Sequence, residues 1–410
     1  MKNLLIKNLR DNSPKGENLF DINSTVISYK TGIPILDYYL GYLVKVYNKD
    51  DELVDKYPSI GIPAGCFVTV IGKPSTAKTT MLTQIAANIV REFDNGSVIH
   101  FDLEQSQNYS RIQVLTKFKM SDMENGKYIL RQEQNSISDI KKTIMRIYKE
   151  KTSNPDSYKY KTGKMDEFGK EIVIYEPTCI IIDSIATLST EYNENDKKDI
   201  ARLEEVGSQT ERMRLTGEIT RFFNELLPYI RAANIIVFTI NQIKTNPGMG
   251  IIKSPAEILY LNPDEALPGG RAPQFLAHIL LKNIAIGSEK YTKEDNGFDG
   301  FGMYTMVIKS RVNQAGQKIP LVYDKIRGVD SLRTTLAYAK ELGLITGNKN
   351  KMYFVDDKDY YFSMTNVHDD FNNRRELYKK LYDTVIPILS NRLSTLDDDE
   401  MEIVNEEMMY

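Results

Sequence analysis

Residues 71–80, which read IGKPSTAKTT, form a short motif that dictates its own local structure. The motif closes the apolar run 66–72 and precedes a helical pattern that begins KTTMLTQIAANIV. A glycine-started turn between a strand and a helix exposes backbone N–H groups and a helix N-terminus, and both favour a bound phosphate. The stretch therefore predicts a phosphate-binding loop, G-x-x-x-x-G-K-[ST], with Ala77 in place of the second glycine.

The expected nucleotide contacts in this loop come from Gly72, Pro74, Ser75, Thr76, Ala77, Lys78, Thr79 and Thr80. The ammonium group of Lys78 would reach the β- and γ-phosphates, and the hydroxyl of Thr79 would ligate Mg²⁺. A left-handed backbone at Ala77 would cost about 1–2 kcal/mol, because its Cβ would crowd the following carbonyl oxygen. We therefore predict that Ala77 has a negative φ and belongs to the first turn of the helix. The alternative is a turn before an ordinary helix.

Two further apolar runs end in carboxylates. The run VIHFDLEQS ends in Glu104, which is placed to orient or deprotonate an attacking water. The run CIIIDS ends in Asp183, which is placed near Mg²⁺. Either carboxylate alone has an ordinary explanation, since strand-end Asp residues often cap helices and exposed Glu residues are common. Three strand ends that carry Lys/Thr, Glu and Asp in this order predict a nucleoside triphosphate hydrolase.

Strand-like runs alternate with helical patterns along most of the chain. The predicted strands span residues 66–72, 97–103, 128–131, 179–184, 235–240, 277–284 and 303–310. A helix is predicted before the 235–240 strand, because Leu215, Ile219, Phe222, Leu226 and Ile230 recur at helical spacing. Near-continuous apolar strands separated by helices indicate an α/β fold, with a mostly parallel sheet covered on both faces. Residues 151–170 are polar and aperiodic, and predict a surface insertion.

Composition limits the function classes. Among 410 residues the formal net charge is −3, which argues against a general affinity for nucleic acid but allows a local basic loop. The sequence contains no run of 18 apolar residues, so no membrane-spanning helix is predicted. Cys66 and Cys179, the two cysteines, lie in apolar runs and predict buried, reduced thiols in a cytoplasmic protein.

The approach to the phosphate loop carries a resemblance to a known family. Residues 29–41 read YKTGIPILDYYLG, and residues 61–80 resume as GIPAGCFVTVIGKPSTAKTT. This pattern resembles the RecA family, and the resemblance extends through most of 29–345. It implies a RecA-like ATPase core at 29–330 with insertions at about 42–60 and 151–170, and ATP with Mg²⁺ as cofactors. It also implies that Glu104 activates the attacking water and that Tyr109, in the sequence YSR, stacks on adenine.

The segment FTINQI (238–243) resembles a family strand that ends in Asn-Gln. There the glutamine, here Gln242, senses the γ-phosphate and signals to a loop that binds single-stranded DNA. The loop contacts so implied are Lys244, Met249, Ile251, Lys253, Gly269 and Gly270, and the segment is long, aperiodic and rich in Pro and Gly. A second DNA loop would follow Asp183, with Arg212 and Arg214 as its candidate contacts. A solvated loop with incidental lysines is the alternative.

The segment MVIKSRVNQ (306–314) resembles the family strand that carries two basic residues to the ATP of a neighbouring subunit. Lys309 and Arg311 are two apart, so on a strand both would point to one face. Offered by a second subunit, they would neutralise charge on the transferring phosphoryl group, like an arginine finger. Two solvent-facing cations on an edge strand are the alternative.

Within the family, the phage UvsX-like branch is the nearest match. The loose phosphate loop, a small C-terminal module at 331–390 and an acidic tail at 391–410 favour it. Residues 1–28 would form an N-terminal arm and, by resemblance, an oligomerisation element. The implied function is a DNA-dependent ATPase that forms filaments on single-stranded DNA and catalyses homologous pairing and strand exchange. Its implied partners are single-stranded DNA, homologous duplex DNA, further copies of the chain, a loading mediator and a single-strand-binding protein.

Two other functions remain open. A DnaB-type hexameric replicative helicase shares the core fold and the basic finger, although residues 1–30 are short for the separate helical domain of such helicases. A slow or non-catalytic ATP-binding recombination mediator is compatible with Ala77, whereas Lys78 and Glu104 favour hydrolysis.

Overall fold

The computed structural model describes nearly all of the core and the C-terminal module. The described residues are 27–48, 50, 52–133, 136–188, 209–245, 260–262, 265–268, 272–348, 350–369 and 371–394. Residues 1–26 of the predicted arm and 395–410 of the predicted acidic tail lie outside them. Among the described residues, no helix is both long and apolar enough to cross a membrane.

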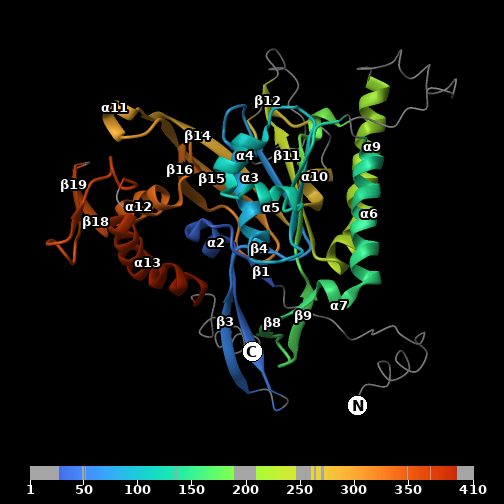
Figure 1. Cartoon of the computed structure of the whole chain (residues 1–410), viewed down its shortest axis with the longest axis horizontal. Helices are drawn as coiled ribbons and strands as arrows, with labels where there is room; N and C mark the ends of the chain where they lie inside the picture. The colour runs from blue at the N-terminus through green and yellow to red at the C-terminus, as the bar shows by residue number, and fades with distance from the viewer. Residues whose placement is uncertain are drawn as a thin grey trace, which may run out of the picture.

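A nine-stranded sheet forms the centre of the molecule (Figure 1). Six strands are parallel: β5 (Phe67–Gly72), β6 (Ser97–Asp102), β7 (Tyr128–Arg131), β10 (Thr178–Asp183), β11 (Ile235–Gln242) and β14 (Ile279–Tyr291). Three antiparallel strands extend the β14 edge: β15 (Gly300–Ser310), β16 (Lys318–Asp324) and β17 (Gly328–Val329). The strand order is β17-β16-β15-β14-β5-β11-β10-β6-β7. The predicted α/β fold with a mostly parallel sheet is confirmed, and each predicted strand is present.

Helices cover both faces of the sheet, as the near-continuous apolar strands require. On one face lie α3 (Lys78–Val90), α4 (Tyr109–Thr116) and α5 (Met120–Glu124); on the other lie α6 (Ile137–Ser153) and α9 (Gln209–Ala232). Alternation along β5 fits these two layers, since Val68 and Val70 belong to the cluster of α3 while Phe67 packs on Phe223 of α9. In α9, the predicted apolar row lines the core. Cys66 and Cys179 are buried free thiols, as predicted.

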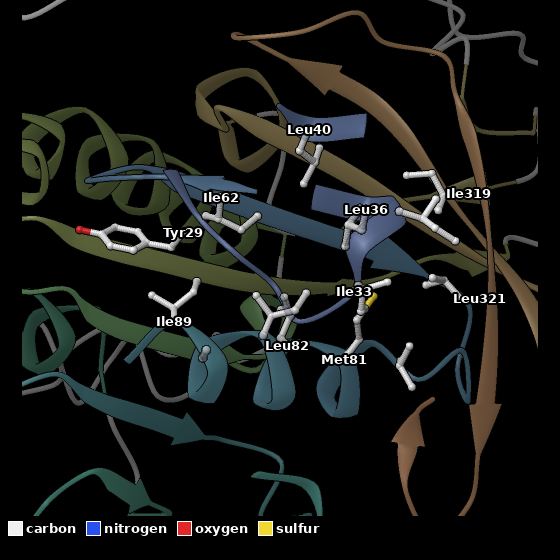
Figure 2. Close-up of a cluster of buried hydrophobic side chains, with 14 of the residues drawn as sticks. Tyr29, Ile33, Leu36, Leu40, Ile62, Met81, Leu82, Ile89, Ile319 and Leu321 are labelled. Carbon is white, nitrogen blue, oxygen red and sulfur yellow. The ribbon is translucent and has the colours of Figure 1, made fainter. Parts of the chain in front are cut away.

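A short N-terminal part closes the α3 face. It comprises β1 (Ser28–Tyr29), α2 (Pro34–Leu40) and β4 (Ile62–Pro63), and β1 pairs antiparallel with β4. Figure 2 shows Leu36 of α2, Met81 of α3 and Leu321 of β16 in one buried cluster. The antiparallel edge of the sheet is therefore packed into the same core as the phosphate loop helix.

Two hairpins project together from the lower edge of the molecule in Figure 1. The first is β2 (Tyr42–Tyr47) with β3 (Leu53–Ser59); the second follows α7 (Pro155–Tyr158) and pairs β8 (Lys159–Met165) with β9 (Glu171–Tyr175). The predicted insertion at 151–170 contains regular structure that its polar, aperiodic sequence does not indicate. Tyrosine and lysine alternate in YKYK at the start of β8, and Asp166 accepts hydrogen bonds from the N–H groups of Phe168 and Lys170 to fix the turn.

The C-terminal module continues the main core. It contains α12 (Ser331–Glu341), a small sheet of β18 (Ile345–Asn348), β19 (Lys351–Phe354) and β20 (Tyr361–Phe362), and α13 (Phe371–Ser394). Its buried side chains, such as Met352 and Leu381, belong to the same hydrophobic cluster as the α3 face. Helix α13 runs past residue 390, where the sequence placed the start of the tail. The division into domains otherwise stays a prediction.

Three further short helices and one two-stranded ribbon complete the described part of the fold. The 3-10 helix η1 (Ile185–Thr187) follows β10, α10 (Ala272–Leu276) precedes β14, and α11 (Lys293–Asn296) joins β14 to β15. The ribbon pairs β12 (Lys244–Thr245) with β13 (Glu265–Ala266), directly after β11. The ribbon includes Lys244, one of the residues predicted to bind DNA.

Candidate nucleotide site

The phosphate loop connects β5 to α3, and its backbone differs from our prediction at one residue. Ala77 has φ +56° and ψ +23°, which is a left-handed conformation, and α3 begins only at Lys78. Ser75 is also left-handed, with φ +61°. The prediction of a negative φ at Ala77 is therefore wrong. The chain must reverse just before the helix so that successive N–H groups turn toward one concavity, and this geometry outweighs the steric cost at Ala77.

The left-handed backbone at Ala77 is the conformation expected of a glycine in the usual G-x-x-x-x-G-K-[ST] loop. A glycine at position 77 would adopt this conformation without strain, so the loop keeps the shape of the usual motif and Ala77 carries the cost. Gly72 is required for a different reason. A Cβ added there would lie 2.7 Å from the Thr76 hydroxyl oxygen and 2.8 Å from the carbonyl oxygen of Asn283.

Asn283 holds the loop from the neighbouring strand. Its buried side-chain amide donates to the carbonyl oxygen of Thr76 over 3.0 Å, and its Oδ1 accepts from the Thr305 hydroxyl over 3.0 Å. The Thr76 hydroxyl in turn donates to the carbonyl oxygen of Lys73 over 2.9 Å. Sequence analysis missed Asn283, although an asparagine inside the apolar run 277–284 is a signal that it has a polar partner.

The ammonium group of Lys78 lies inside the phosphate loop, where it was predicted to bind the phosphates. Its ammonium group donates to the carbonyl oxygens of Gly72 over 3.1 Å and Lys73 over 2.7 Å. Burial lowers the pKa of Lys78 to about 8, against the attraction of Asp183 and Glu104. A bound phosphate would restore the preference for the charged form, because it adds negative charge at short range.

Thr79 and Asp183 lie together, as the sequence predicted. The Thr79 hydroxyl donates to Oδ2 of Asp183 over 2.6 Å. Burial raises the pKa of Asp183 to about 6, although the hydrogen bond from Thr79 opposes this shift. A hydroxyl and a carboxylate oxygen at the foot of a phosphate loop match the ligands that Mg²⁺ takes beside nucleotide phosphates. These two residues fit the predicted metal, which would neutralise phosphate charge when bound.

Glu104 receives two hydrogen bonds at the same edge of the sheet. Its Oε1 accepts from the Ser184 hydroxyl over 2.9 Å and from the Gln242 side-chain amide over 3.0 Å. Strand register explains the meeting, since Asp183 pairs with Asp102 and Gln242 pairs with Gly72. The carboxyl ends of β6, β10, β11 and β5 thus bring the predicted residues together. Sequence analysis missed Ser184, which directly follows Asp183.

A family comparison agrees with this geometry. Residues 29–224 match the family model described as ATPase: KaiC, which is slightly under half of the chain. The match contains the phosphate loop, Glu104 and Asp183. The core is that of a RecA-like P-loop ATPase. No curated protein matches the chain. One of the solved structures that match is the RadB recombinase, at TM-score 0.40 and 16% identity, with 66% of this chain and 92% of that chain covered.

Tyr109 begins α4 of this ATPase core, close to the loop that follows Glu104. Its side chain is 41% exposed, and its hydroxyl accepts a hydrogen bond from the N–H of Leu130 over 3.3 Å. Arg111 donates to the carbonyl oxygen of Ile326 over 2.6 Å and so ties α4 to the β16–β17 turn. The exposed face of Tyr109 is available to a planar ligand, and its stacking on adenine stays a prediction.

Lys309 and Arg311 are not brought to the phosphate loop of their own chain. Lys309 of β15 pairs with Leu280 of β14, which in turn pairs with Thr69 of β5. Lys309 is therefore two strands away from β5, at the level of a residue three positions before Gly72. With about 4.8 Å between strands and about 3.3 Å per residue, the two Cα positions are about 14 Å apart. Arg311 lies farther away and beyond the end of β15, so the prediction that both residues occupy the strand is wrong for Arg311.

The predicted DNA contacts are described only in part. Lys244 is exposed on β12, and Arg214 lies on α9. Arg212 belongs to the same helix, but its side chain lies outside the description. Five other predicted contacts lie outside the described residues altogether: Met249, Ile251, Lys253, Gly269 and Gly270. Their role in DNA binding stays a prediction.

Proposed function

We propose that this chain is a DNA-dependent ATPase that assembles on single-stranded DNA and promotes homologous pairing and strand exchange in recombination and repair. The hydrogen bond between Gln242 and Glu104 carries this proposal. It joins the carboxylate predicted to activate water to the last residue of β11. The next described strand, β12, begins at Lys244, so the hydrolytic centre and the predicted polynucleotide contact are two residues apart along the chain.

The chemistry follows from the positions of the side chains. Lys78 and Thr79 would hold the β- and γ-phosphates and the Mg²⁺ that offsets their charge. Glu104 would accept a proton from the attacking water while the water oxygen bonds to the γ-phosphorus, and the bond from that phosphorus to the β,γ-bridging oxygen would break with ADP as the leaving group. A polynucleotide that displaces Gln242 would change the orientation and basicity of Glu104, because a donated hydrogen bond stabilises the carboxylate. Hydrolysis would then depend on DNA.

Assembly of several copies completes the proposed site. Lys309 and Arg311 lie near the amino-terminal ends of the parallel strands, whereas the phosphate loop lies at their carboxyl ends, so in this proposal the two residues act on a nucleotide held by another copy. A contact between these opposite ends is head to tail, and such contacts generate rings or helical filaments. We include the UvsX-like branch, a cytoplasmic location, a loading mediator and a single-strand-binding protein in the proposal.

Electron microscopy tests the proposal most directly. The full-length protein is imaged with single-stranded DNA and a slowly hydrolysed ATP analogue. Helical filaments would support the recombinase, closed rings would favour the helicase, and neither form would favour the mediator. The K78A variant, measured in parallel, should lose ATP hydrolysis; retained turnover would place the active site elsewhere.

A further inference from the structure

A carboxylate outside the predicted site is shared by two lysines at the phosphate loop. Glu265, on β13, lies with Oε1 3.2 Å from the ammonium nitrogen of Lys73 and with Oε2 3.5 Å from that of Lys282. The N–H of Asn262 also donates to Oε2 over 3.1 Å. Lys282 donates in addition to the carbonyl oxygen of Tyr260 over 2.7 Å. We call Lys73, Glu265 and Lys282 the Glu265 cluster.

The three side chains differ sharply in exposure. The side chain of Glu265 is 2% exposed and that of Lys282 is 14% exposed, whereas Lys73 is 60% exposed. Burial would raise the pKa of Glu265, but the Asn262 N–H and the two lysines outweigh it and hold the pKa below its usual value. Glu265 and Lys282 are therefore a fixed pair, and Lys73 is the partner that is free to reorient toward solvent.

The cluster connects two parts of the proposed machinery. Lys73 directly follows Gly72, and its carbonyl oxygen accepts from Lys78. In the ribbon, Lys244 of β12 pairs with Ala266 of β13, the residue after Glu265. Besides the backbone bond from Ile243 to Gly72, a side-chain contact from the phosphate loop to the ribbon thus runs through Glu265, and this contact does not use the Gln242 side chain.

We propose that Glu265 is a positioning residue that couples nucleotide binding to polynucleotide binding through Lys73. This inference rests on the proposed function and specifies how its site is regulated. Without nucleotide, the Lys73–Glu265 contact ties the β12–β13 ribbon to the phosphate loop. A triphosphate in the loop competes with Glu265 for the charge of Lys73, and the ribbon is released from the loop while Glu265 stays paired with Lys282. By linkage, polynucleotide binding at the released ribbon favours nucleotide binding by the same factor.

The test measures the affinity of the full chain for fluorescent single-stranded DNA, with and without a slowly hydrolysed ATP analogue. The wild type should bind about tenfold more tightly or better with the analogue, in the range of ordinary coupling. E265Q and K73Q should each reduce this ratio to about twofold or less, because the tie is absent in both nucleotide states. K73R keeps the charge and should keep most of the ratio.

The double variant separates coupling from general damage. Because the two residues act on one contact, E265Q/K73Q should have the same ratio as either single variant, whereas independent structural roles would add. Thermal unfolding shows whether each variant is folded. Undiminished ratios in both folded single variants, or additive losses in the double variant, would overturn the proposal.

A second measurement keeps the coupling separate from the proposed function. If the wild type neither hydrolyses ATP nor binds DNA, the proposed function has failed. Amide hydrogen exchange in residues 260–268 is then compared with and without the nucleotide analogue. The coupling predicts faster exchange at β13 in the wild type when the analogue is bound, and no such change in E265Q. Equal exchange in the wild type with and without bound analogue would refute it.

Discussion

Ala77 has a backbone conformation that favours glycine over a residue with a side chain. Its left-handed φ of +56° suits glycine, and a methyl group in that conformation costs about 1–2 kcal/mol. The sequence placed the alanine correctly in the motif, but it could not reveal this conformation. The helix start at Lys78 and the direction of the loop amides fix φ at residue 77, and both depend on the rest of the fold.

The first prediction concerns this strain. The A77G variant should unfold with a free energy about 1 kcal/mol higher than the wild type, since relief of strain exceeds the entropy that glycine adds to the unfolded chain. Urea unfolding without nucleotide measures the change. A337G, inside helix α12, is the matched control and should lose about 1 kcal/mol. A loss of stability in A77G would show that the left-handed turn carries no strain.

The second prediction concerns the buried carboxylate of Asp183. Burial raises its pKa in the native state to about 6, above the value near 3.9 of an unfolded chain. Between these values the native state binds more protons, so the wild type should lose stability as the pH rises from about 4 to about 6. D183N lacks this titration and should be more stable than the wild type by roughly 2 kcal/mol at pH 7.

Unfolding of the nucleotide-free proteins at pH 4 and pH 7 measures this difference. D183N should resemble the wild type at pH 4 and exceed it at pH 7, and it should hydrolyse little ATP because a predicted Mg²⁺ ligand is lost. Parallel pH profiles for the two proteins would contradict the assignment of the slope to Asp183.

At the scale of elements, hydrophobic pattern was enough to locate the strands. The apolar run predicted β7 at Tyr128–Arg131 without error, although this edge strand is only partly buried. The β8–β9 hairpin was missed, since its strands are largely polar and both of their faces are partly exposed. Carboxylates at the ends of β6 and β10 predicted the site, whereas Ser184, Asn283 and Glu265 contribute through tertiary contacts that no spacing reveals.

The third prediction concerns the support that β14 gives the phosphate loop. N283A removes the donor to the buried Thr76 carbonyl oxygen, and should cost about 1–3 kcal/mol of unfolding free energy. It should also weaken ATP affinity roughly tenfold, because the loop amides lose their fixed orientation. Unfolding and nucleotide titration measure the two effects.

T305V is the control for that variant. It removes only the hydroxyl that donates to Asn283, and leaves the bond from Asn283 to Thr76 in place. Its effect on ATP affinity should be clearly smaller than that of N283A. Equal losses of affinity would mean that Asn283 acts through general packing of β14 and not through the loop.

At the scale of the whole molecule, the proposed function requires a second copy of the chain to complete the nucleotide site. The phosphate loop lies at the carboxyl ends of the parallel strands, and Lys309 and Arg311 lie toward their amino-terminal ends. Motif resemblance predicted the basic pair, and the sheet register places it away from the phosphate loop of its own chain. The relative placement of two copies does not follow from one sequence, because it depends on the shapes of both surfaces.

The fourth prediction follows from this division. K78A and R311A should each hydrolyse little ATP in the presence of single-stranded DNA, the first through its loop and the second through its contribution to the neighbour. An equal mixture of the two should recover roughly a quarter of the wild-type rate, since that share of random contacts unites an intact loop with an intact Arg311. A mixture as inactive as its components would refute action between subunits.

Because the phosphate loop and the basic pair lie at opposite ends of the strands, the proposed assembly fixes the number of complete nucleotide sites. An open row of copies always leaves one loop at its end without a neighbour, so two copies share a single complete site and long rows approach one site per chain. A closed ring has no such end. Turnover per chain should therefore climb with row length in an open assembly, and stay fixed once a ring has closed. Under the proposed action between copies, the rate itself would measure how many chains have joined.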